Sequence, residues 1–368
     1  MKCFKVALSI KNLKNNYGFF IMLTILILFF ITLFIFTSIS FKKLKKEIKT
    51  IIWALTFNEK PLKKKKLKNK PDIVLKKVKK KLNKISINKN NSKYKKGNHK
   101  RKLKIIENDK DKSNYRIYPQ KIEINDANDT NYKKINKILK INSFELNSLD
   151  YKEGRIIDQR NYCEYYCSLL KYNHPLIFSF SLYNDYNSKI IRFFLFFFSF
   201  GLDLSINALF FTDEAMHKIH QDKGTFDFLY QIPQIIYSLL ISWFIDSLIR
   251  KLALSQDNIV GLKQSKGITK KRKKNLFRIL KLKFTLYFLL TFIILMLFFY
   301  YITCFCGIYV NTQIHLINDS LISLATSMLL PFLFFSIPGC FRISALRAEK
   351  PNQRMLYNFS ILLENILC

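Results

Sequence analysis

Five stretches of the chain are almost uninterrupted runs of apolar residues, and polar or charged residues fill the segments between them. A helix that crosses the hydrocarbon core of a bilayer needs about 20 mostly apolar residues, and each run is long enough. The runs are unbroken rather than alternating and exceed the length of barrel strands, which favours helices. We therefore expect an all-α integral membrane protein whose five transmembrane helices lie at Gly18–Phe41, Phe193–Thr212, Phe228–Ile249, Phe284–Tyr309 and Ser320–Phe341.

The first run is typical of a membrane anchor rather than of a removed signal peptide. It lies in a charge-free stretch from Asn15 to Phe41, which is too long for the core of a signal peptide. No small-residue cleavage site follows it. We therefore expect this run to remain in the protein as its first span.

The basic residues of the connecting segments predict the orientation. Arg250–Lys283 holds twelve Lys or Arg and one acid, whereas 310–319 holds no Lys or Arg and 213–227 is acidic. An excess of Lys and Arg marks cytosolic loops. We therefore expect 250–283 and the C-terminal tail in the cytosol and the N-terminus outside. The first run supports this orientation by a small margin only, because lysines flank both of its ends.

The composition reflects two kinds of segment, apolar runs and lysine-rich stretches. It carries 62 Lys and Arg against 25 acids, a net charge of +37, yet 49% of its residues are hydrophobic. A soluble nucleic-acid-binding protein would not contain the apolar runs, so nucleic acid is not an expected partner. A tract at 60–104 has 21 basic residues and one acid, and such a self-repelling tract is expected to be disordered.

These patterns divide the chain into six parts. They are an outer N-terminal segment (1–17), a transmembrane helix (18–41), a Lys/Asn-rich disordered cytosolic segment (42–151), an interfacial cytosolic segment (152–192), a four-helix transmembrane module (193–347) and a cytosolic tail (348–368).

The lysines next to the spans predict contact with anionic lipid headgroups of the inner leaflet, where each contributes about 1 kcal/mol. The alternative is a solvated tether whose lysines contact only water. The candidate headgroup contacts are Lys42, Lys43, Lys45, Lys46, Lys270, Lys271, Arg272, Lys273 and Lys274. The segment 275–283, which alternates apolar and basic residues, is either an interfacial helix or an extension of the fourth span. Tyr162–Phe180 is a second candidate interfacial element.

A few polar residues inside the runs are candidates for an ion pathway. Asp203 follows Arg192 by eleven residues, which places it roughly 16 Å deep, and a carboxylate there costs about 2.5 kcal/mol or more. Asn207 and Ser199 share its helix face, and Gln231 and Gln234 flank Pro233 in the third run. The ion-pathway hypothesis therefore uses Asp203, Asn207, Gln231 and Gln234. The alternative is that these residues only hold helices together by hydrogen bonds.

An outer loop contains two histidines that suggest metal chemistry. Asp213, His217 and His220 share one face of a helix and could bind a divalent metal. His217 and Asp222 also match the spacing of glycerolipid acyltransferases, but no supporting motif occurs elsewhere. A simpler interpretation is a short helix capped by Thr212 or Asp213. The seven cysteines are irregularly spaced and odd in number, so we expect neither a disulfide framework nor a zinc site. We expect no enzymatic activity and no cofactor.

Several short motifs resemble those of a family of uncharacterised multi-pass transmembrane proteins from ciliate-like protists. They are Leu182–Lys189, Asn207–Phe211, Met216–Ile219, Tyr230–Gln234, Asn311–Ile317 and Phe341–Ile343. The resemblance implies no activity. It does imply that Met1–Val6 is the junction with a larger cysteine-bearing outer region, which agrees with an outside N-terminus. His220 stands where the family tends to have an aromatic residue, which weakens the metal hypothesis.

Two functional hypotheses follow. The leading one is a non-enzymatic anchoring or signalling module of a larger surface protein, in the plasma membrane rather than an internal membrane. The lipid bilayer is its expected partner, with a homo-oligomer or a surface complex as possible assemblies. The alternative is an ion channel or ion-coupled transporter that uses the intramembrane carboxylate of Asp203.

Overall fold

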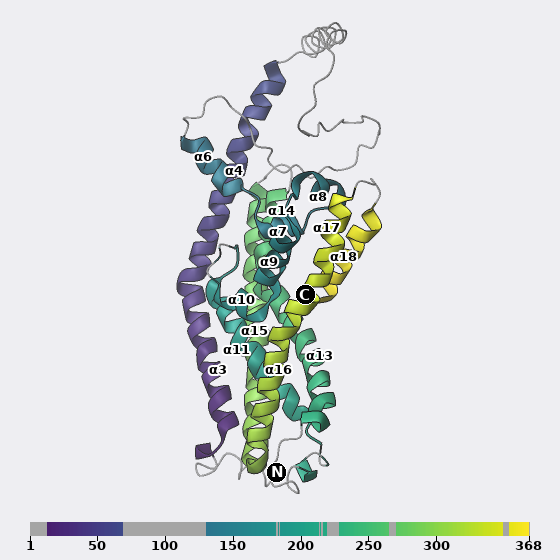
Figure 1. Cartoon of the computed structure of the whole chain (residues 1–368). Helices are drawn as coiled ribbons and strands as arrows, with labels where there is room; N and C mark the ends of the chain where they lie inside the picture. Colours follow the sequence, from purple (N-terminus) through teal and green to yellow (C-terminus); the bar gives the residue numbers. More distant parts are fainter. Residues whose placement is uncertain are drawn as a thin grey trace. The chain divides into compact units, whose positions relative to one another are not determined.

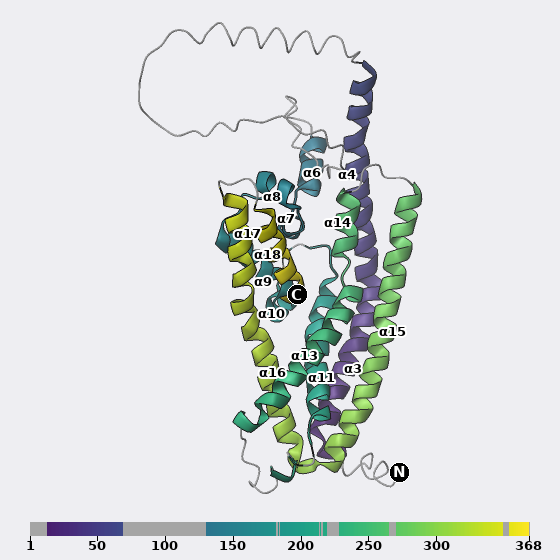
Figure 2. The same cartoon turned by 90° about the vertical axis from the view of Figure 1, so that its right-hand side faces the viewer.

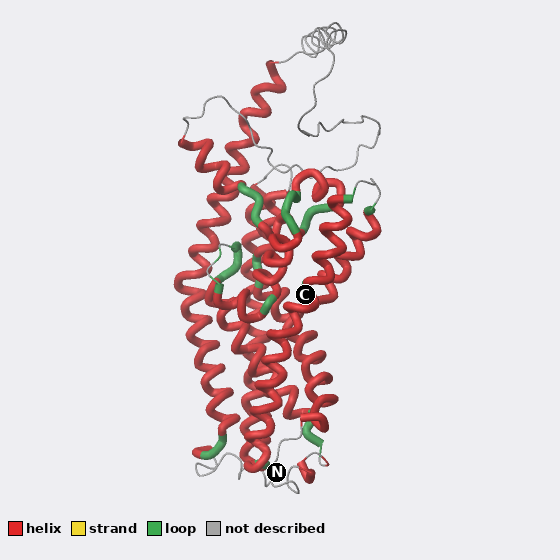
Figure 3. Tube along the Cα trace, viewed as in Figure 1, coloured by secondary structure: helices red, strands yellow, loops and turns green. Residues whose placement is uncertain are grey.

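The structure is a computed structural model, and it describes residues 13–68, 130–181, 183, 185–212, 214, 216–218, 228–264, 270–348 and 353–367. Every regular element in these residues is a helix (Figure 3). Five helical segments are long and apolar enough to cross a membrane: Tyr17–Phe57, Lys189–Leu209, Ile232–Ala253, Lys271–Ile308 and Val310–Arg347. The predicted all-α fold with five candidate spans is confirmed, and by helix composition the chain is a multi-pass membrane protein.

Most of the described helices follow one another along the chain with short connections. In order they are α3 (Tyr17–Ile35), the π-helical η1 (Phe36–Ser40), α4 (Phe41–Lys68), α6 (Thr130–Leu139), α7 (Ser143–Asn147), α8 (Tyr151–Ile157), α9 (Tyr162–Asn173), α10 (Pro175–Phe180), α11 (Lys189–Leu209), α13 (Phe228–Ala253), α14 (Gln256–Gln264), α15 (Lys270–Ile308), the 3₁₀-helical η2 (Val310–Thr312), α16 (Gln313–Phe334), α17 (Ser336–Arg347) and α18 (Arg354–Leu367).

The chain forms two compact units. The first comprises 1–48, 140–262 and 270–368, and the second comprises 49–139 and 263–269. In the first unit, α14, α18 and the beginning of α15 lie at one end, and the start of α3 lies at the other (Figures 1 and 2). We call the former the basic end, because the Lys/Arg-rich start of α15 lies there.

Helix α11 is the centre of the first unit. It contacts α3, α13, α15 and α16, and all residues from Gly201 to Ala208 are buried. The surrounding helices instead expose large apolar side chains on their outer faces, among them Phe34, Leu240 and Leu297. Such a bundle is suited to a lipid bilayer. Lipid tails solvate the apolar outer side chains, whereas a polar group on the outer face would find no hydrogen-bond partner there.

Close packing of α3 depends on two glycines and a group of aromatic rings. A Cβ atom at Gly201 would lie 2.9 Å from Ile25 Cδ1, and one at Gly18 would lie 2.6 Å from Cys306 Sγ. Phe29 of α3 packs its ring 5.7 Å from Phe194 of α11 and 6.0 Å from Phe288 of α15. A side chain at either position would displace the end of a neighbouring side chain, so glycine favours this close approach of α3.

The observed helices extend beyond the predicted segments at the first span and in the tail. The first helix continues through η1 and α4 to Lys68, so the predicted disordered segment 42–151 begins with a helix. Its buried positions Leu44 and Ile48 are four residues apart, which is the helical period. Segment 275–283 is a continuous part of α15, which agrees with the extension alternative. The tail 348–368 contains α18, which packs on α17.

The predicted fifth span consists of two helices. It is interrupted at Phe335, between α16 and α17. Pro338 lies in the first turn of α17, where its missing N–H costs least, and so marks a new helix start rather than a continuation. Tyr162–Phe180 forms α9 and α10, which pack against α16, α17 and α11.

The second unit contains the later part of α4 and α6. Ala54 of α4 is buried with Ile135 and Leu139 of α6, and Leu55 and Phe57 pack at the edge of this cluster. The apolar residues of α6 recur every three or four positions, so one face of this short helix meets α4.

Candidate functional site

A row of polar side chains lies in the bundle interior between α11 and α13. Three pairs of polar side chains face one another there. Ser238 Oγ donates a hydrogen bond to Asn207 Oδ1 at 2.6 Å. Asp203 faces Ser242, and both line one cavity. Ser199 Oγ donates to Asp246 Oδ1 at 2.8 Å.

The pairing follows from a shared spacing. The α11 residues Ser199, Asp203 and Asn207 recur every fourth position, and so do the α13 residues Ser238, Ser242 and Asp246. Residues four apart are neighbours on one helix surface. Because α11 and α13 run antiparallel (Figure 2), each step along one helix matches a step backwards along the other. The two rows of side chains, one on each helix, have the same spacing, so each polar residue of α11 lies opposite one of α13.

Helix α16 completes this arrangement. Asn207 Nδ2 donates to Ser323 Oγ at 3.1 Å, and Gln234 Nε2 donates to Asp319 Oδ2 at 3.5 Å and to the Asn207 carbonyl oxygen at 3.4 Å. Asn207 is fully buried and contacts both neighbouring helices. Ser327 lies one further step along α16 and borders the same cavity as Asp203.

We call these residues of the three helices the polar ladder. Its members are Ser199, Asp203 and Asn207 of α11, Gln234, Ser238, Ser242, Asp246 and Arg250 of α13, and Asp319, Ser323 and Ser327 of α16.

The carboxylates of the polar ladder differ in their partners. Asp246 Oδ2 lies 3.5 Å from Arg250 Nε, and this arginine also stacks on the Phe178 ring at 4.8 Å. Within the described part of the chain, no Lys or Arg pairs with Asp203 or Asp319. Asp319 Oδ1 is buried and forms no hydrogen bond with a protein group. An unused buried polar atom costs about 1–3 kcal/mol, so the ladder retains binding capacity that packing does not use.

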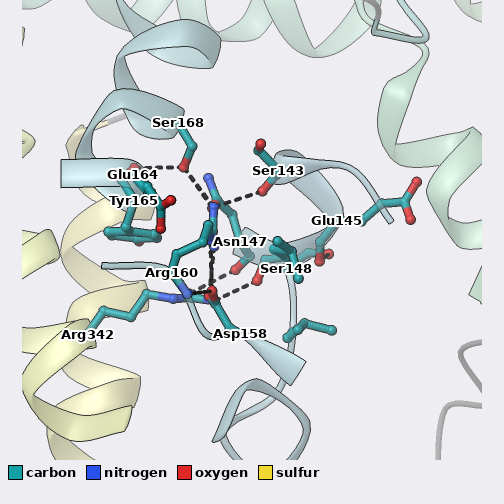
Figure 4. A network of polar contacts seen from close by, with 12 residues as sticks. Ser143, Glu145, Asn147, Ser148, Asp158, Arg160, Glu164, Tyr165, Ser168 and Arg342 are labelled. Atoms are coloured by element: carbon teal, nitrogen blue, oxygen red, sulfur yellow. Dashed lines mark hydrogen bonds and ion pairs between the residues drawn. The ribbon is translucent and has the colours of Figure 1, made fainter. Parts of the chain in front are cut away.

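A second polar cluster lies at the basic end and is centred on Arg342 of α17 (Figure 4). Arg342 is fully buried, and its Nη1 and Nη2 donate to the carbonyl oxygens of Asn147 and Leu146 at 2.9 and 2.7 Å. Its Nη2 lies 3.7 Å from Asp158 Oδ2, which Arg160 also contacts at 2.7 Å. We call this the Arg342 cluster.

Aromatic rings enclose the Arg342 guanidinium. The rings of Tyr165 and Tyr357 lie 5.0 and 4.8 Å from its centre. Tyr165 donates to Glu364 Oε2 at 2.9 Å, and Tyr357 donates to the Leu149 carbonyl oxygen at 2.6 Å. Burial raises the pKa of Tyr357 to about 12 and raises the pKa of Glu364, although Arg342 opposes both changes. The cluster thus joins α17 and α18 to the α7–α9 segment.

A third polar cluster, with a buried charge pair, lies at the start of α11. Arg192 Nη1 lies 3.4 Å from Asp185 Oδ2, and Nη2 donates to the Ser181 carbonyl oxygen at 2.9 Å. Tyr183 stacks on the guanidinium at 4.6 Å. Burial raises the pKa of Asp185, and Arg192 opposes that change. The pair fixes the segment that leads into α11.

Of the predicted ion-pathway residues, the structure brings together Asn207 and Gln234, and it places Asp203 one helical turn from Asn207. Gln231 belongs to α13, but its side chain lies outside the described residues. Pro233 is accommodated within α13.

The predicted metal site is only partly visible. His217 is exposed on a short helical turn, and Asp213 and His220 lie outside the described residues. Among the residues that the structure describes, no group of three His, Cys, Asp or Glu is placed to hold a metal ion.

The lysines predicted to contact lipid headgroups lie at the surface. Lys42, Lys43, Lys45 and Lys46 are exposed on α4, and Lys271, Arg272 and Lys274 are exposed at the start of α15. Lys273 is half-buried, and the side chain of Lys270 lies outside the described residues. Their contact with lipid stays a prediction.

Sequence reasoning missed most of the polar ladder. The signal was available, because Gln234, Ser238, Ser242 and Asp246 occupy every fourth position of one predicted span, and Arg250 continues the spacing directly after it. Asp319 was treated as a loop residue, because it directly precedes the predicted start of the fifth span. In the structure it lies inside α16, fully buried.

No protein-family model, curated protein or solved structure matches this chain. Its function must therefore be inferred from its own residues.

Proposed function

We propose that the chain is an ion channel or ion-coupled transporter that handles a cation or proton along the polar ladder. The supporting observation is the length of the ladder. From Gln234 to Arg250 the ladder extends along α13 for about 24 Å at 1.5 Å per residue, and a hydrocarbon core is about 30 Å thick. A polar group at each turn provides a path for a charged species that lipid would exclude.

Two carboxylates favour this function over simple helix adhesion. An interhelical hydrogen bond in a membrane contributes about 0.6 kcal/mol on average, and serine or asparagine suffices to make one. An aspartate at the membrane centre costs about 2.5–3.5 kcal/mol. Asp203 and Asp319 are buried without a cationic partner in the described residues, so their cost exceeds what adhesion returns. A cation or proton would offset it.

The deciding experiment is ion flux through the purified protein in liposomes. We expect cation or proton flux in the unmodified protein and its loss in Asp203→Asn and Asp319→Asn, which preserve side-chain shape. Asp257→Asn, an equal charge change at an exposed position of α14, is the matched control and should keep the flux. Absence of flux from folded, inserted protein would reject the proposal.

A second candidate is the anchoring or signalling module of a larger surface protein. The Arg342 cluster favours it, because the cluster locks α17, which follows α16, onto the α7–α9 segment. A displacement of α16 would therefore reach the basic end. The family resemblance is consistent with an additional outer region before Met1. Sequencing full-length transcripts tests this candidate, which predicts an upstream in-frame region rich in cysteine, and surface labelling tests plasma-membrane residence.

A further inference from the structure

A cavity of about 370 Å³ borders the polar ladder between α11, α13 and α16. Its size falls within the range of about 300–1,000 Å³ typical of small-molecule sites. Figure 2 shows α13 and α16 crossing and then diverging toward the basic end, and residues of both helices line the cavity. Its walls are mainly apolar, and its polar and aromatic lining includes Asp203, Ser242, Asp246, Arg250, Trp243 and Phe334.

The charges in this cavity do not balance. Asp246 and Arg250 pair with each other at 3.5 Å and neutralise one another. Asp203, which is 5% exposed, has no cationic partner among the described residues. Ser242 is 4% exposed, and its hydroxyl faces the Asp203 carboxylate. The lining therefore presents one carboxylate without a cationic partner beside a hydroxyl, which is complementary to a single positive charge.

The rim of the cavity lies at the outer surface of the bundle. Trp243 is 45% exposed and Leu240 is 59% exposed, and both line the cavity. In a bilayer this surface would face lipid. A molecule that partitions into the membrane would therefore reach the cavity sideways, and aromatic rings at the rim favour a cation.

We propose that this cavity binds an amphiphilic organic cation, with its ammonium group at Asp203 and Ser242 and its apolar body along Trp243 and Phe334. The inference deepens the proposed function and rests on it, because it assigns a substrate class to the same carboxylate. An anionic amphiphile would meet two carboxylates and only one arginine. A neutral molecule would leave Asp203 uncompensated, and an inorganic cation would leave the apolar walls without contacts.

Binding can be read from the protein's own fluorescence. The chain has two tryptophans, so Trp53→Phe leaves Trp243 as the single reporter at the rim. The protein in nanodiscs of zwitterionic lipid would be titrated with octyltrimethylammonium, octylamine, octanol and octanoate. We expect octylamine to bind at least about tenfold more tightly than octanol, the factor of one charge-assisted hydrogen bond. Octyltrimethylammonium, which has no N–H to donate, should also bind more tightly than octanol through its charge, and octanoate should bind most weakly.

Variants separate the site from partitioning into the bilayer, which is the same for all of them. Asp203→Asn should remove the preference for cations and leave octanol unchanged. Asp257→Asn, an equal charge change on α14, should keep the preference. Ser327→Phe fills the cavity from α16 and should weaken all four probes. If Asp203→Asn does not fold, the inference is still tested by the relative affinities of the four probes for the unmodified site and by the weaker binding expected in Ser327→Phe.

Equal affinity of the site for the cations and for octanol would overturn the inference. It would also be overturned if Asp203→Asn and Asp257→Asn changed the preference for cations equally. The liposome flux assay distinguishes this failure from failure of the proposed function. Probe binding without cation or proton flux would retain the cavity and reject ion movement. Flux without probe binding would retain ion movement and reject the amphiphile.

Discussion

Replacing Arg342 by methionine tests whether the Arg342 cluster holds the basic end together. The change removes two hydrogen bonds to the carbonyl oxygens of Leu146 and Asn147 and the contacts with two tyrosine rings. Removing one partner of a buried charge pair costs about 3–5 kcal/mol. Asp158 keeps Arg160 at 2.7 Å, so its carboxylate is not left unpaired. We therefore expect the lower part of this range, about 3 kcal/mol.

Hydrogen exchange measures this loss locally. Every 1.4 kcal/mol of opening free energy changes the exchange rate tenfold, so amides of α8, α17 and α18 should exchange about 100-fold faster. Amides of α3 should be unaffected. Arg347→Met is the matched control on the same helix, because Arg347 is exposed and donates one hydrogen bond, to the Arg160 carbonyl oxygen. We expect Arg347→Met to increase the amide exchange rates of α8, α17 and α18 by no more than about threefold.

Equal effects of the two substitutions would refute this reasoning. Methionine can fill the volume of a buried arginine, and replacing whole buried charge networks by apolar residues is stabilising in some proteins. A slower exchange in Arg342→Met would therefore mean that packing, rather than the guanidinium, stabilises the junction of α17 with the α7–α9 segment.

Two further predictions concern packing and pH. Gly201→Val should lower thermal stability by about 1–3 kcal/mol, because a Cβ there lies 2.9 Å from Ile25 Cδ1. Gly261→Ala, where a Cβ meets no atom within 4 Å, should raise stability by up to about 1 kcal/mol, and the two melting temperatures should shift in opposite directions. The pKa of Glu364 is raised from 4.5 in the folded state, so the folded state binds more protons and the protection of α18 should fall as pH rises above 4.5. Glu364→Gln should remove that decline in hydrogen exchange corrected for intrinsic rates, and an unchanged decline would contradict the assignment to this carboxyl.

The five spans could be predicted because apolar content over 20 residues is a local property. The sequence also predicted Asp203 and Asn207 as neighbours, since they are four residues apart on one helix. What it did not indicate was which face of α13 meets α11. That depends on the register of two antiparallel helices, which no local pattern specifies.

The Arg342 cluster could not be predicted from sequence. Arg342 and Asp158 are far apart along the chain, and Arg342 directly follows the fifth predicted span, where a solvated charge is expected. Its burial depends on where α17 leaves α16, and the interruption at Phe335 decides that. A charge next to a span is normally solvated, so the rule that indicated the orientation also concealed this residue.

The two polar regions of the first unit differ in how their charges are compensated, and this difference separates packing from function. In the Arg342 cluster, Asp158 contacts two arginines, and Glu364 accepts a hydrogen bond from Tyr165. Such a cluster stabilises the fold without needing a ligand. In the polar ladder, two buried aspartates lack any cation in the described residues, although apolar residues could fill the same space. A bundle whose interior only had to pack would not keep them, so the ladder is where ion chemistry should be sought.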